Sequence, residues 1–576
     1  MPKFIQFKLT SSFKVILLAS LLIYSCKQQK SEPYPIDIAS SSENGMVVSA
    51  HPLASEIGVN IMKMGGNAID AMVATQFALA VVYPRAGNIG GGGFMVIRQP
   101  DGKSFALDYR EKAPEAAYEK MYQDEASEVI DSLSLYGQLS VGVPGSVAGM
   151  IKAWRKFGKI KDFSVLMDPA IKLAENGYQI NSDQARRLNK YKSDFDKYND
   201  HTIPFLKDEE WKLNDQLIQS DLAKTLMAIR ENGIGGFYKG WVAEKIDSQM
   251  RAHGGILRQE DLRKYNAVWR EPVKVDYNEY TMISMPPPSS GGIVLGQLLK
   301  MLAGFDLKSK DLHSVESIHL LTEVEKRAYA DRASHMGDID FYPVPVEQLL
   351  DSVYLKHKMA DFDPQAASPS RAVKAGEFER MQESMETTHT SIVDADGMAV
   401  SATTTLNSNY GSKVMVDGCG FFLNNEMDDF SIKPGTANQF GLVGGKANAI
   451  EPGKRMLSSM TPTIFERNSE LFLVLGSPGG SQIITSVLQV FLQVAEQGLT
   501  VADAVKAPRF HHQWLPDKIQ MEANGFDPEI IQQLESLGHK VEVVDRIGLV
   551  KAILVNEKGW LDGAGDPRSF DDVEGY

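Results

Sequence analysis

Residues 387–394 read TTHTSIVD and begin a β-strand abruptly after a segment of different composition. The preceding segment, residues 361–386, holds prolines, serines and many charges but few apolar side chains, which is typical of an exposed, mobile linker. After the strand, a turn signal at 394–397 leads into a Thr-rich strand at 398–406, so the two strands are predicted to form a hairpin. The chain thus changes from linker to strand at Thr387.

A threonine at such a junction can act as a nucleophile. The hydroxyl of Thr387 is weakly nucleophilic unless a base lies beside it, and a cut in the chain before Thr387 would supply that base as the new α-amine. The pKa of an α-amine is ~8, close to a working pH. The same hydroxyl can make the cut, by attacking the carbonyl of Glu386 and passing through an ester. The alternative is an ordinary strand threonine, which the junction alone does not exclude.

A pair of glycines lies at a second junction. A hairpin is predicted at 462–475, and its second strand leads through Gly479 and Gly480 into an apolar helix at 483–495. The glycines leave two unencumbered backbone N–H groups at a helix N-terminus, where the helix dipole favours negative charge. With an acyl substrate this arrangement is an oxyanion hole. A turn that only requires glycine conformations explains the same residues.

The composition is that of an ordinary globular protein. The 576 residues are 43% hydrophobic and 23% charged, with 48 glycines and 26 prolines, which excludes disorder, a collagen-like repeat and a polytopic membrane protein. The net charge of −14 argues against non-specific nucleic-acid binding. The two cysteines, Cys26 and Cys419, allow neither a disulfide framework nor a four-cysteine zinc site, and no G-x-S-x-G elbow offers another nucleophile.

Upstream of the linker the pattern is α/β. A strand at 47–50, an amphipathic helix at 53–64, a more apolar helix at 68–82 and a glycine loop that runs into a strand at 90–97 are predicted. The glycine loop lacks the strand–GxGxxG–helix order of a dinucleotide site, so we predict that it serves close backbone packing.

The middle of the chain, residues 150–360, is helix-rich. Its segment 322–332 predicts a solvated helix face with i, i+4 ion pairs, and this interpretation is favoured over metal binding by His319, Glu323 and Glu325. No HExxH motif occurs, and neither a metal site nor a cofactor is predicted.

The first 26 residues read as an export signal. A basic start precedes a short apolar run at 15–24, and Cys26 then ends a string that resembles a lipobox, in which the cysteine is lipidated and becomes the mature N-terminus. We predict a lipoprotein signal peptide at 1–25, a polar tether at 26–45, and an extracytoplasmic protein (periplasm or cell surface) anchored to a membrane through Cys26. A plain signal peptide or an uncleaved anchor is the alternative. Cys419 then lacks a partner and is predicted to be a small buried side chain.

Several longer motifs occur in order and together resemble the γ-glutamyltransferase (γ-glutamyl transpeptidase) family. They extend over the chain from about Met46 to Tyr576 and read LDYREKAP at 107–114, GVPGSV at 142–147, TTHTS at 387–391, NNEMDDF at 424–430, LSSMTP at 457–462, GSPGGS at 476–481, PRFHHQW at 508–514 and GDPR at 565–568.

The resemblance implies an N-terminal-nucleophile hydrolase, an α+β fold built as a four-layer αββα sandwich. In that family one precursor cleaves itself, here between Glu386 and Thr387. The products would be a large subunit, 46–386 with the exposed linker 361–386 at its end, and a small catalytic subunit, 387–576. The two subunits would stay together as a heterodimer.

The resemblance also implies a role for each residue of the site. Thr387 would be the nucleophile, supported by a hydrogen bond from Thr405, and the amides of Gly479 and Gly480 would form the oxyanion hole. The remaining residues would hold the two charged groups of the substrate: Arg110, Ser458 and Ser459 its α-carboxylate, and Asn407, Glu426 and Asp429 its α-ammonium. This division is physically sensible, because arginine binds carboxylates bidentately and ionised carboxylates only accept hydrogen bonds.

The implied reaction has two steps and needs no cofactor. Thr387 would attack the γ-carbonyl of glutathione or another γ-glutamyl amide and form an ester. Water, an amino acid or a dipeptide would then accept the γ-glutamyl group. The segment 433–445 resembles the lid loop of many bacterial members, although Phe440 stands where these often carry tyrosine. The string at 547–551 also departs from the usual polar pattern of the family.

Two other functions are compatible with the sequence. An acylase of the same superfamily, which removes glutaryl or cephalosporin side chains, shares the nucleophile but has no ammonium to bind, so Glu426 and Asp429 argue against it. An inactive surface lipoprotein with the same fold is disfavoured because Thr387, Arg110, Asp429 and both glycines are retained.

Overall fold

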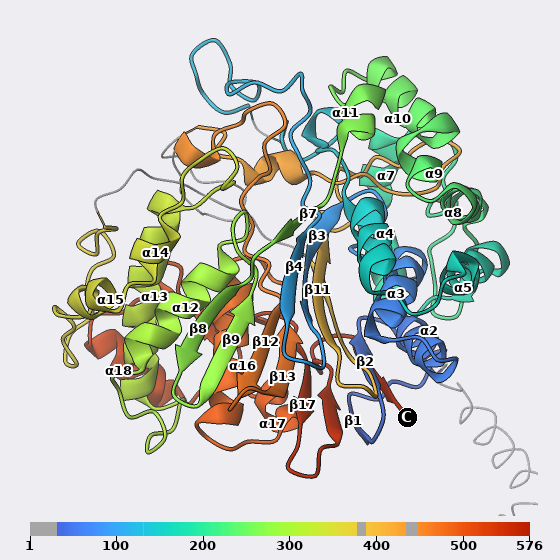
Figure 1. Cartoon of the computed structure of the whole chain (residues 1–576). Coiled ribbons are helices and arrows are strands. Elements are labelled where there is room, and N and C mark those ends of the chain that lie inside the picture. The colour runs from blue at the N-terminus through green and yellow to red at the C-terminus, as the bar shows by residue number, and fades with distance from the viewer. Residues whose placement is uncertain (1–30, 131, 377–386, 434–445) are drawn as a thin grey trace, which may run out of the picture.

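Two seven-stranded sheets pack face to face, and helices cover the outer side of each sheet (Figure 1). The structure is a computed structural model that describes residues 31–130, 132–376, 387–433 and 446–576. The first sheet has the order β1(Ala39–Ser42), β18(Leu561–Ala564), β17(Lys551–Val555), β13(Glu470–Gly476), β12(Thr463–Arg467), β9(Tyr280–Ser284), β8(Val273–Tyr277). The second has the order β19(Asp572–Gly575), β2(Met46–Ser49), β10(Thr388–Val393), β11(Ala399–Thr405), β3(Gly92–Arg98), β4(Ser104–Asp108), β7(Val268–Arg270).

The helices form the two outer layers. Those beside the second sheet are α2(Pro52–Lys63), α3(Ala68–Val82), α4(Ser146–Phe157), α5(Phe163–Asn176) and α8(Ser220–Asn232). Those beside the first sheet are α12(Gly291–Leu302), α13(Val315–His335), α16(Gln482–Ala495) and α17(Val501–Lys506). The order helix, sheet, sheet, helix is the predicted four-layer αββα arrangement.

Shorter elements complete the molecule. The further helices are α6(Ser182–Lys190), α7(Lys192–Tyr198), α9(Gly235–Tyr238), α10(Gly240–Ala252), α11(Gln259–Lys264), α14(Val346–Leu349), α15(Ser352–Lys358), α18(Pro528–Ser536) and the 3₁₀ turns η1(Gln138–Ser140), η2(Glu426–Asp429) and η3(Lys446–Asn448). Two small sheets consist of β14(Phe510–His511), β15(Ile519–Glu522) and β16(Val541–Val544), and of β5(Tyr178–Gln179) and β6(Gln216–Leu217).

Side chains of the second sheet alternate between two hydrophobic cores. Met95 and Ile97 of β3 pack with the helices α2 to α5, whereas Phe94 and Val96 face the first sheet. This is the period of two that an extended strand imposes. Because both faces of the sheet are covered, every residue of β10 and β11 is buried, including the threonines and serines. The strand that follows Thr387 therefore lies in the interior of the molecule.

Most local predictions are confirmed. The apolar helix α3 covers 68–82 as predicted, both hairpins form, and Cys419 is buried. The glycine loop at 90–93 does serve close packing, because a Cβ on Gly91 would overlap the carbonyl oxygen of Thr405.

The predicted solvated helix face is wrong. Residues 317–335 of α13 are buried, charged side chains included. The reason is that their charges are paired inside the protein: Arg327 contacts Glu323 at 2.7 Å and Asp361 at 2.7 Å, and Lys326 contacts Glu323 at 2.9 Å. A predicted i, i+4 ion pair does form, between Glu323 and Arg327, but it lies inside the protein.

Both predicted flexible segments are more structured than expected in their described parts. Of the predicted tether, Ala39–Ser42 form β1, an edge strand paired with β18, because backbone pairing needs no apolar side chains. Of the predicted linker, residues 361–376 are mostly exposed but held by hydrogen bonds, for example from Ser370 to Asp517 at 2.7 Å. Residues 377–386 lie outside the described part.

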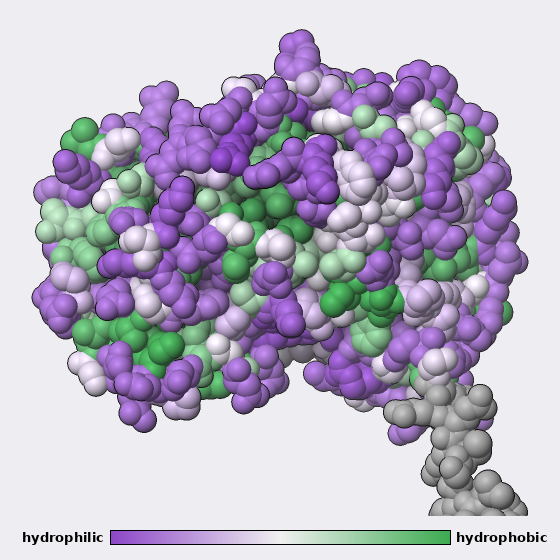
Figure 2. All heavy atoms as spheres, turned by 90° about the horizontal axis from the view of Figure 1, so that it is seen from below, coloured by the Kyte–Doolittle hydropathy of each residue, from purple (hydrophilic) through white to green (hydrophobic). Residues whose placement is uncertain are grey.

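The surface seen from below carries mainly polar residues, with apolar residues in separate smaller patches (Figure 2). In the described part of the chain, no helix is both long enough and apolar enough to span a membrane.

Candidate active site

Thr387 lies directly before β10 in the second sheet. Thr388 of β10 pairs with Thr404 of β11, so the antiparallel register brings Thr387 level with Thr405. The Oγ1 atom of Thr387 is buried and has no hydrogen-bond partner among the described residues. The hydroxyl of Thr405 accepts from the backbone N–H of Asn407 at 2.7 Å and hydrogen-bonds the carboxyl group of Glu426.

A buried histidine on the strand after Thr387 packs against the opposite sheet. His389 Nδ1 lies 2.9 Å from Thr403 Oγ1, and its Nε2 lies 3.1 Å from Ser391 Oγ. Burial lowers the pKa of His389 well below its ordinary value, so the ring is neutral. Gly476, the last residue of β13, provides the space for this ring, because a Cβ there would overlap it. The contact sets the start of β10 beside the end of β13.

The glycine pair continues from β13 into α16. Gly479 and Gly480 have φ values of +128° and +60°, a region that favours glycine. Their carbonyls accept from Gln482 N at 3.2 Å and Ile483 N at 2.9 Å, so the two glycines form the first turn before the helix. Gly548 packs against Gly479, which places the unusual string at 547–551 beside this loop.

A buried charge cluster surrounds Arg110, which follows β4. Arg110 Nη1 donates to Glu426 Oε2 at 2.6 Å and to Glu111 Oε2 at 3.3 Å, and Nη2 donates to Asp429 Oδ2. Glu426 and Asp429 lie at the two ends of η2, and all four side chains are almost fully buried. Arg110 and these two acidic residues thus meet in the structure, although they are more than 300 residues apart in the chain.

The electrostatic balance of the cluster keeps the arginine charged. Burial by itself lowers the pKa of Arg110, but Glu426, Asp429 and Glu111 raise it above its ordinary value. Burial also raises the pKa of Glu426 well above its ordinary value, while Arg110 opposes that shift. The cluster thus holds three carboxyl groups around one guanidinium, more acidic groups than cationic ones.

The segment 456–459 lies against the same arginine. Arg110 donates to the carbonyls of Met456 and Leu457, both at 3.3 Å. Ser458 Oγ accepts from Met460 N at 3.3 Å, and Ser459 Oγ accepts from Arg332 Nη2 at 3.3 Å. Sequence reasoning missed Arg332, because α13 was expected to present that residue to solvent.

Glu111 makes the stability of this cluster depend on pH. Burial raises its pKa from 4.5 to about 8, although Arg110 acts in the opposite direction. Because the folded protein holds this proton more tightly than the unfolded chain, the free energy of unfolding should fall as pH rises through the window from about 4.5 to about 8. Glu111→Gln should flatten this slope, as measured by Tm in buffers across that window. A variant whose slope equals that of the parent would show that Glu111 does not titrate there.

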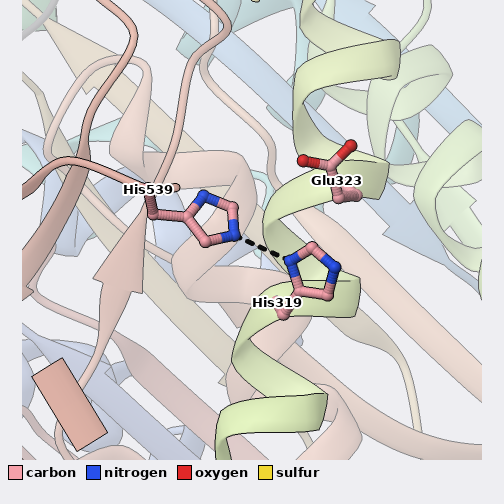
Figure 3. A group of neighbouring side chains, drawn as sticks. All are labelled: His319, Glu323 and His539. Atoms are coloured by element: carbon pink, nitrogen blue, oxygen red, sulfur yellow. Dashed lines mark hydrogen bonds between the residues drawn. The ribbon is translucent and has the colours of Figure 1, made fainter. Parts of the chain in front are cut away.

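A second polar cluster lies away from these residues (Figure 3). His319 and Glu323 of α13 meet His539, and His319 Nδ1 lies 2.7 Å from His539 Nε2. Glu323, however, already accepts from Lys326 at 2.9 Å and Arg327 at 2.7 Å. A metal ion there would compete with two cations for one carboxylate. We interpret the cluster as a structural contact between residues that precede and follow Thr387.

Four predictions concern residues outside the described part. Cys26, Glu386, the signal peptide at 1–25 and Phe440 of the predicted lid all lie there. Lys433 at the start of that lid is described, and its Nζ lies 2.9 Å from Glu128 Oε2.

Comparisons with known proteins identify the family of this chain. A sequence profile described as Gamma-glutamyltranspeptidase matches residues 54–576. The Glutathione hydrolase proenzyme of Escherichia coli (strain K12) is 45% identical over 534 residues, with 92% of each chain covered. The crystal structure of the γ-glutamyltranspeptidase from Helicobacter pylori is 45% identical with a TM-score of 0.56, covering 60% of this chain and 97% of that one. The cephalosporin acylase from Bacillus halodurans is 28% identical with a TM-score of 0.84, covering 96% of this chain and 99% of that one.

The predicted fold class is therefore confirmed, since the four layers are observed and the fold matches solved structures over nearly the whole chain. The profile and the 45% identical relatives also establish the identity that the motifs suggested: this chain is an enzyme of the γ-glutamyltranspeptidase family.

Proposed function

We propose that the chain is the precursor of a glutathione hydrolase that also transfers γ-glutamyl groups. The observation that carries this proposal is the buried set of Arg110, Glu426 and Asp429, which offers both signs of charge within hydrogen-bond reach of one another. A γ-glutamyl group carries a carboxylate and an ammonium on one carbon. Its carboxylate can pair with Arg110 and its ammonium with Glu426 and Asp429, in place of the ion pairs that these residues make with one another. Glutathione is the substrate named for the 45% identical relative.

Each charged end of the substrate has its own set of groups in this proposal. Arg110, Ser458 and Ser459 hold the α-carboxylate, because a guanidinium and two hydroxyls all donate hydrogen bonds. Asn407, Glu426 and Asp429 hold the α-ammonium. Asn407 is fixed for this role by a hydrogen bond from its Nδ2 to the carbonyl of Asn425 at 2.9 Å and by its φ of +70°.

Thr387 performs both chemical steps. Its hydroxyl first attacks the carbonyl of Glu386, and the peptide bond breaks as the ester forms, which frees the α-amine of Thr387. Water then hydrolyses the ester, which releases the carboxylate of Glu386 and restores the hydroxyl. That amine then serves as the base when the hydroxyl attacks the γ-carbonyl of the substrate, and the amides of Gly479 and Gly480 stabilise the oxyanion. Thr405, level with Thr387 across the hairpin, would support the nucleophile through a hydrogen bond formed after cleavage, since Thr387 Oγ1 has no partner among the described residues of the precursor.

The strand order explains why the two products of cleavage would remain together. In the second sheet, β10 and β11 of the small subunit lie between β2 and β3 of the large subunit. Separation would break these two backbone ladders and also those between β19 and β2, between β12 and β9, and between β18 and β1. The domain boundaries proposed here are therefore a large subunit ending at 386 and a small subunit beginning at 387, held as a heterodimer.

The acylase alternative is weaker. A glutaryl side chain lacks an ammonium, so a substrate carboxylate that took Arg110 from Glu426 and Asp429 would leave these two buried carboxylates without a cationic partner, which is costly. The identity of 28% to the acylase structure against 45% to the glutathione hydrolase proenzyme points the same way.

One experiment tests both parts of the proposal. Purified protein on a denaturing gel should give two fragments in place of one 63.6-kDa band, and it should release the aniline from a γ-glutamyl anilide faster when a dipeptide acceptor is added. A single full-length band would contradict self-cleavage. Turnover of a glutaryl anilide in preference to the γ-glutamyl anilide would support the acylase instead.

We further propose that the mature protein is extracytoplasmic and lipid-anchored through Cys26. The support is the lipobox-like string alone. Stable anchoring needs more than one acyl chain, at ~0.8 kcal/mol per buried methylene, which a multiply acylated cysteine provides.

Cys26→Ser should abolish lipid attachment and lipoprotein-type cleavage. Palmitate labelling and detergent-phase partitioning of the whole protein measure this, with Cys419→Ser as the matched control that keeps its label because Cys419 is buried. Equal labelling of Cys26→Ser and the parent protein would rule out the anchor and leave the catalytic proposal untouched.

A further inference from the structure

Arg332 is a buried cation next to the residues proposed to bind the α-carboxylate. It lies near the C-terminal end of α13, is 1% exposed, and donates from Nη2 to Ser459 Oγ at 3.3 Å. Desolvation lowers its pKa to about 10, so it still carries its charge at neutral pH. The sequence gives no sign of this placement, because α13 and residue 459 are far apart in the chain.

The same guanidinium also holds Ser290, which precedes α12. Arg332 Nε donates to Ser290 Oγ at 3.0 Å, and Ser290 Oγ in turn donates to the carbonyl of Ser458 at 3.1 Å. The backbone N–H of Ser290 donates to that carbonyl too, at 2.7 Å. One arginine therefore fixes the backbone at Ser458 and the hydroxyl of Ser459.

The direction of the hydrogen bonds has a chemical consequence. A guanidinium has no acceptor, so Ser459 Oγ must accept from Arg332, and this hydrogen bond does not use the hydroxyl's own hydrogen. A hydroxyl that accepts from a cation is also a stronger donor, because hydrogen bonds in a chain polarise one another. Donation from Ser459 suits a carboxylate and does nothing for an ammonium.

The distribution of charge in the site favours Arg332 as a second cation beside the residues proposed to bind the α-carboxylate. Arg110, the first, lies in contact with Glu111, Glu426 and Asp429, so its charge is already paired. Arg332 feels Asp429 electrostatically but contacts the serine side of the site. It thus makes the potential more positive where the substrate carboxylate would lie than where the ammonium would lie.

We propose that Arg332 is a positioning residue that sets specificity for substrates with an α-carboxylate, acting through Ser459. This inference rests on the function proposed above. It assigns no chemical step to Arg332; the residue orients and polarises the hydroxyl that contacts the substrate.

The test compares two substrates that differ only in the α-carboxylate. The γ-glutamyl anilide carries it, and the 4-aminobutanoyl anilide lacks it. Arg332→Met should lower kcat/KM for the γ-glutamyl anilide by ~10- to 100-fold, the range expected for a hydrogen bond to a charged group, while changing the 4-aminobutanoyl anilide little. A glutaryl anilide, which keeps the carboxylate and lacks the ammonium, should lose activity in parallel with the γ-glutamyl substrate.

Three further variants identify the cause. Arg332→Lys keeps the charge but cannot hold both serines in the same geometry, so its loss should be smaller with the same substrate pattern. Ser459→Ala should also lower kcat/KM for the γ-glutamyl anilide more than for the 4-aminobutanoyl anilide. The double variant Arg332→Met/Ser459→Ala should lose less kcat/KM than the product of the two single fold-losses, because the two residues act together. Arg327→Met removes another buried arginine of α13, one that contacts Glu323 and Asp361 instead, and should leave the substrate ratio unchanged.

The outcomes are separable. Equal losses on the γ-glutamyl and 4-aminobutanoyl anilides would show that Arg332 only supports the fold and would overturn the inference. If Arg332→Met does not mature into two subunits, Arg332→Lys and Ser459→Ala decide, and an unchanged substrate ratio in Ser459→Ala overturns it as well. A parent protein that matures but does not hydrolyse the γ-glutamyl anilide would contradict the proposed function instead.

Discussion

Thr387→Ala is expected to abolish both maturation and turnover. One hydroxyl is the nucleophile in each reaction, and alanine offers none, so the protein should run as a single full-length chain and show no γ-glutamyl hydrolysis above background. A denaturing gel and an anilide assay on the same preparation measure the two effects. The fold itself should persist, because Thr387 Oγ1 has no hydrogen-bond partner among the described residues whose loss would cost stability.

Two variants bracket this result. Thr387→Ser supplies the same group without the methyl and should retain measurable processing. Thr388→Ala removes the neighbouring hydroxyl of β10, and maturation should survive, because Thr388 is proposed to act in neither step. Two subunits in Thr387→Ala protein would mean that another group cuts the chain.

Asp429→Ala is expected to lower kcat/KM for γ-glutamyl substrates by ~100-fold or more. The carboxylate is proposed to hold the substrate ammonium, and truncating one partner of a buried charge pair costs ~2–5 kcal/mol. Maturation should remain nearly complete, since this side chain has no part in cutting the chain. Arg110 keeps Glu426 as a partner at 2.6 Å, so the cluster retains one of its short ion pairs.

The neighbouring acid provides a matched control. Asp428 is equally buried but accepts from Ser134 Oγ at 2.6 Å, and it makes no contact with Arg110 among the described residues. Asp428→Asn should therefore keep kcat/KM close to that of the parent. An unchanged kcat/KM in Asp429→Ala would remove Asp429 from the site and favour the acylase alternative.

Local elements were predictable where neighbours in the chain decide them. The helix α3 covers 68–82 as expected, because Asn67 and Asp70 form a capping box at its start and the sequence is apolar throughout. The hairpins followed from turn residues between β-rich segments. The motifs around Arg110, Thr387 and Gly479 identified a family, and with it the convergence of residues that no local pattern connects.

The burial of charged side chains on α13, unlike the helix and the hairpins, was not predictable from neighbouring residues in the chain. The charged segment of α13 has the spacing of a solvated face, and its partners decide otherwise: Arg327 meets Asp361, and Lys326 donates to the carbonyl of Ser368 at 2.8 Å. Desolvating a charge is costly unless such partners are present, and their presence depends on the path of the chain.

The sequence by itself therefore determined the layered fold, the family, and the residues on which the proposed chemistry rests. Only the tertiary structure decided that Arg110 is shared by three carboxyl groups, that His389 packs beneath Gly476, and that Arg332 reaches Ser459. The physical reason is the distance along the chain over which each kind of interaction acts. Turn, cap and strand signals act over a few residues, whereas the electrostatics and hydrogen bonds of a buried site are set by groups hundreds of residues apart that meet only when the layers pack.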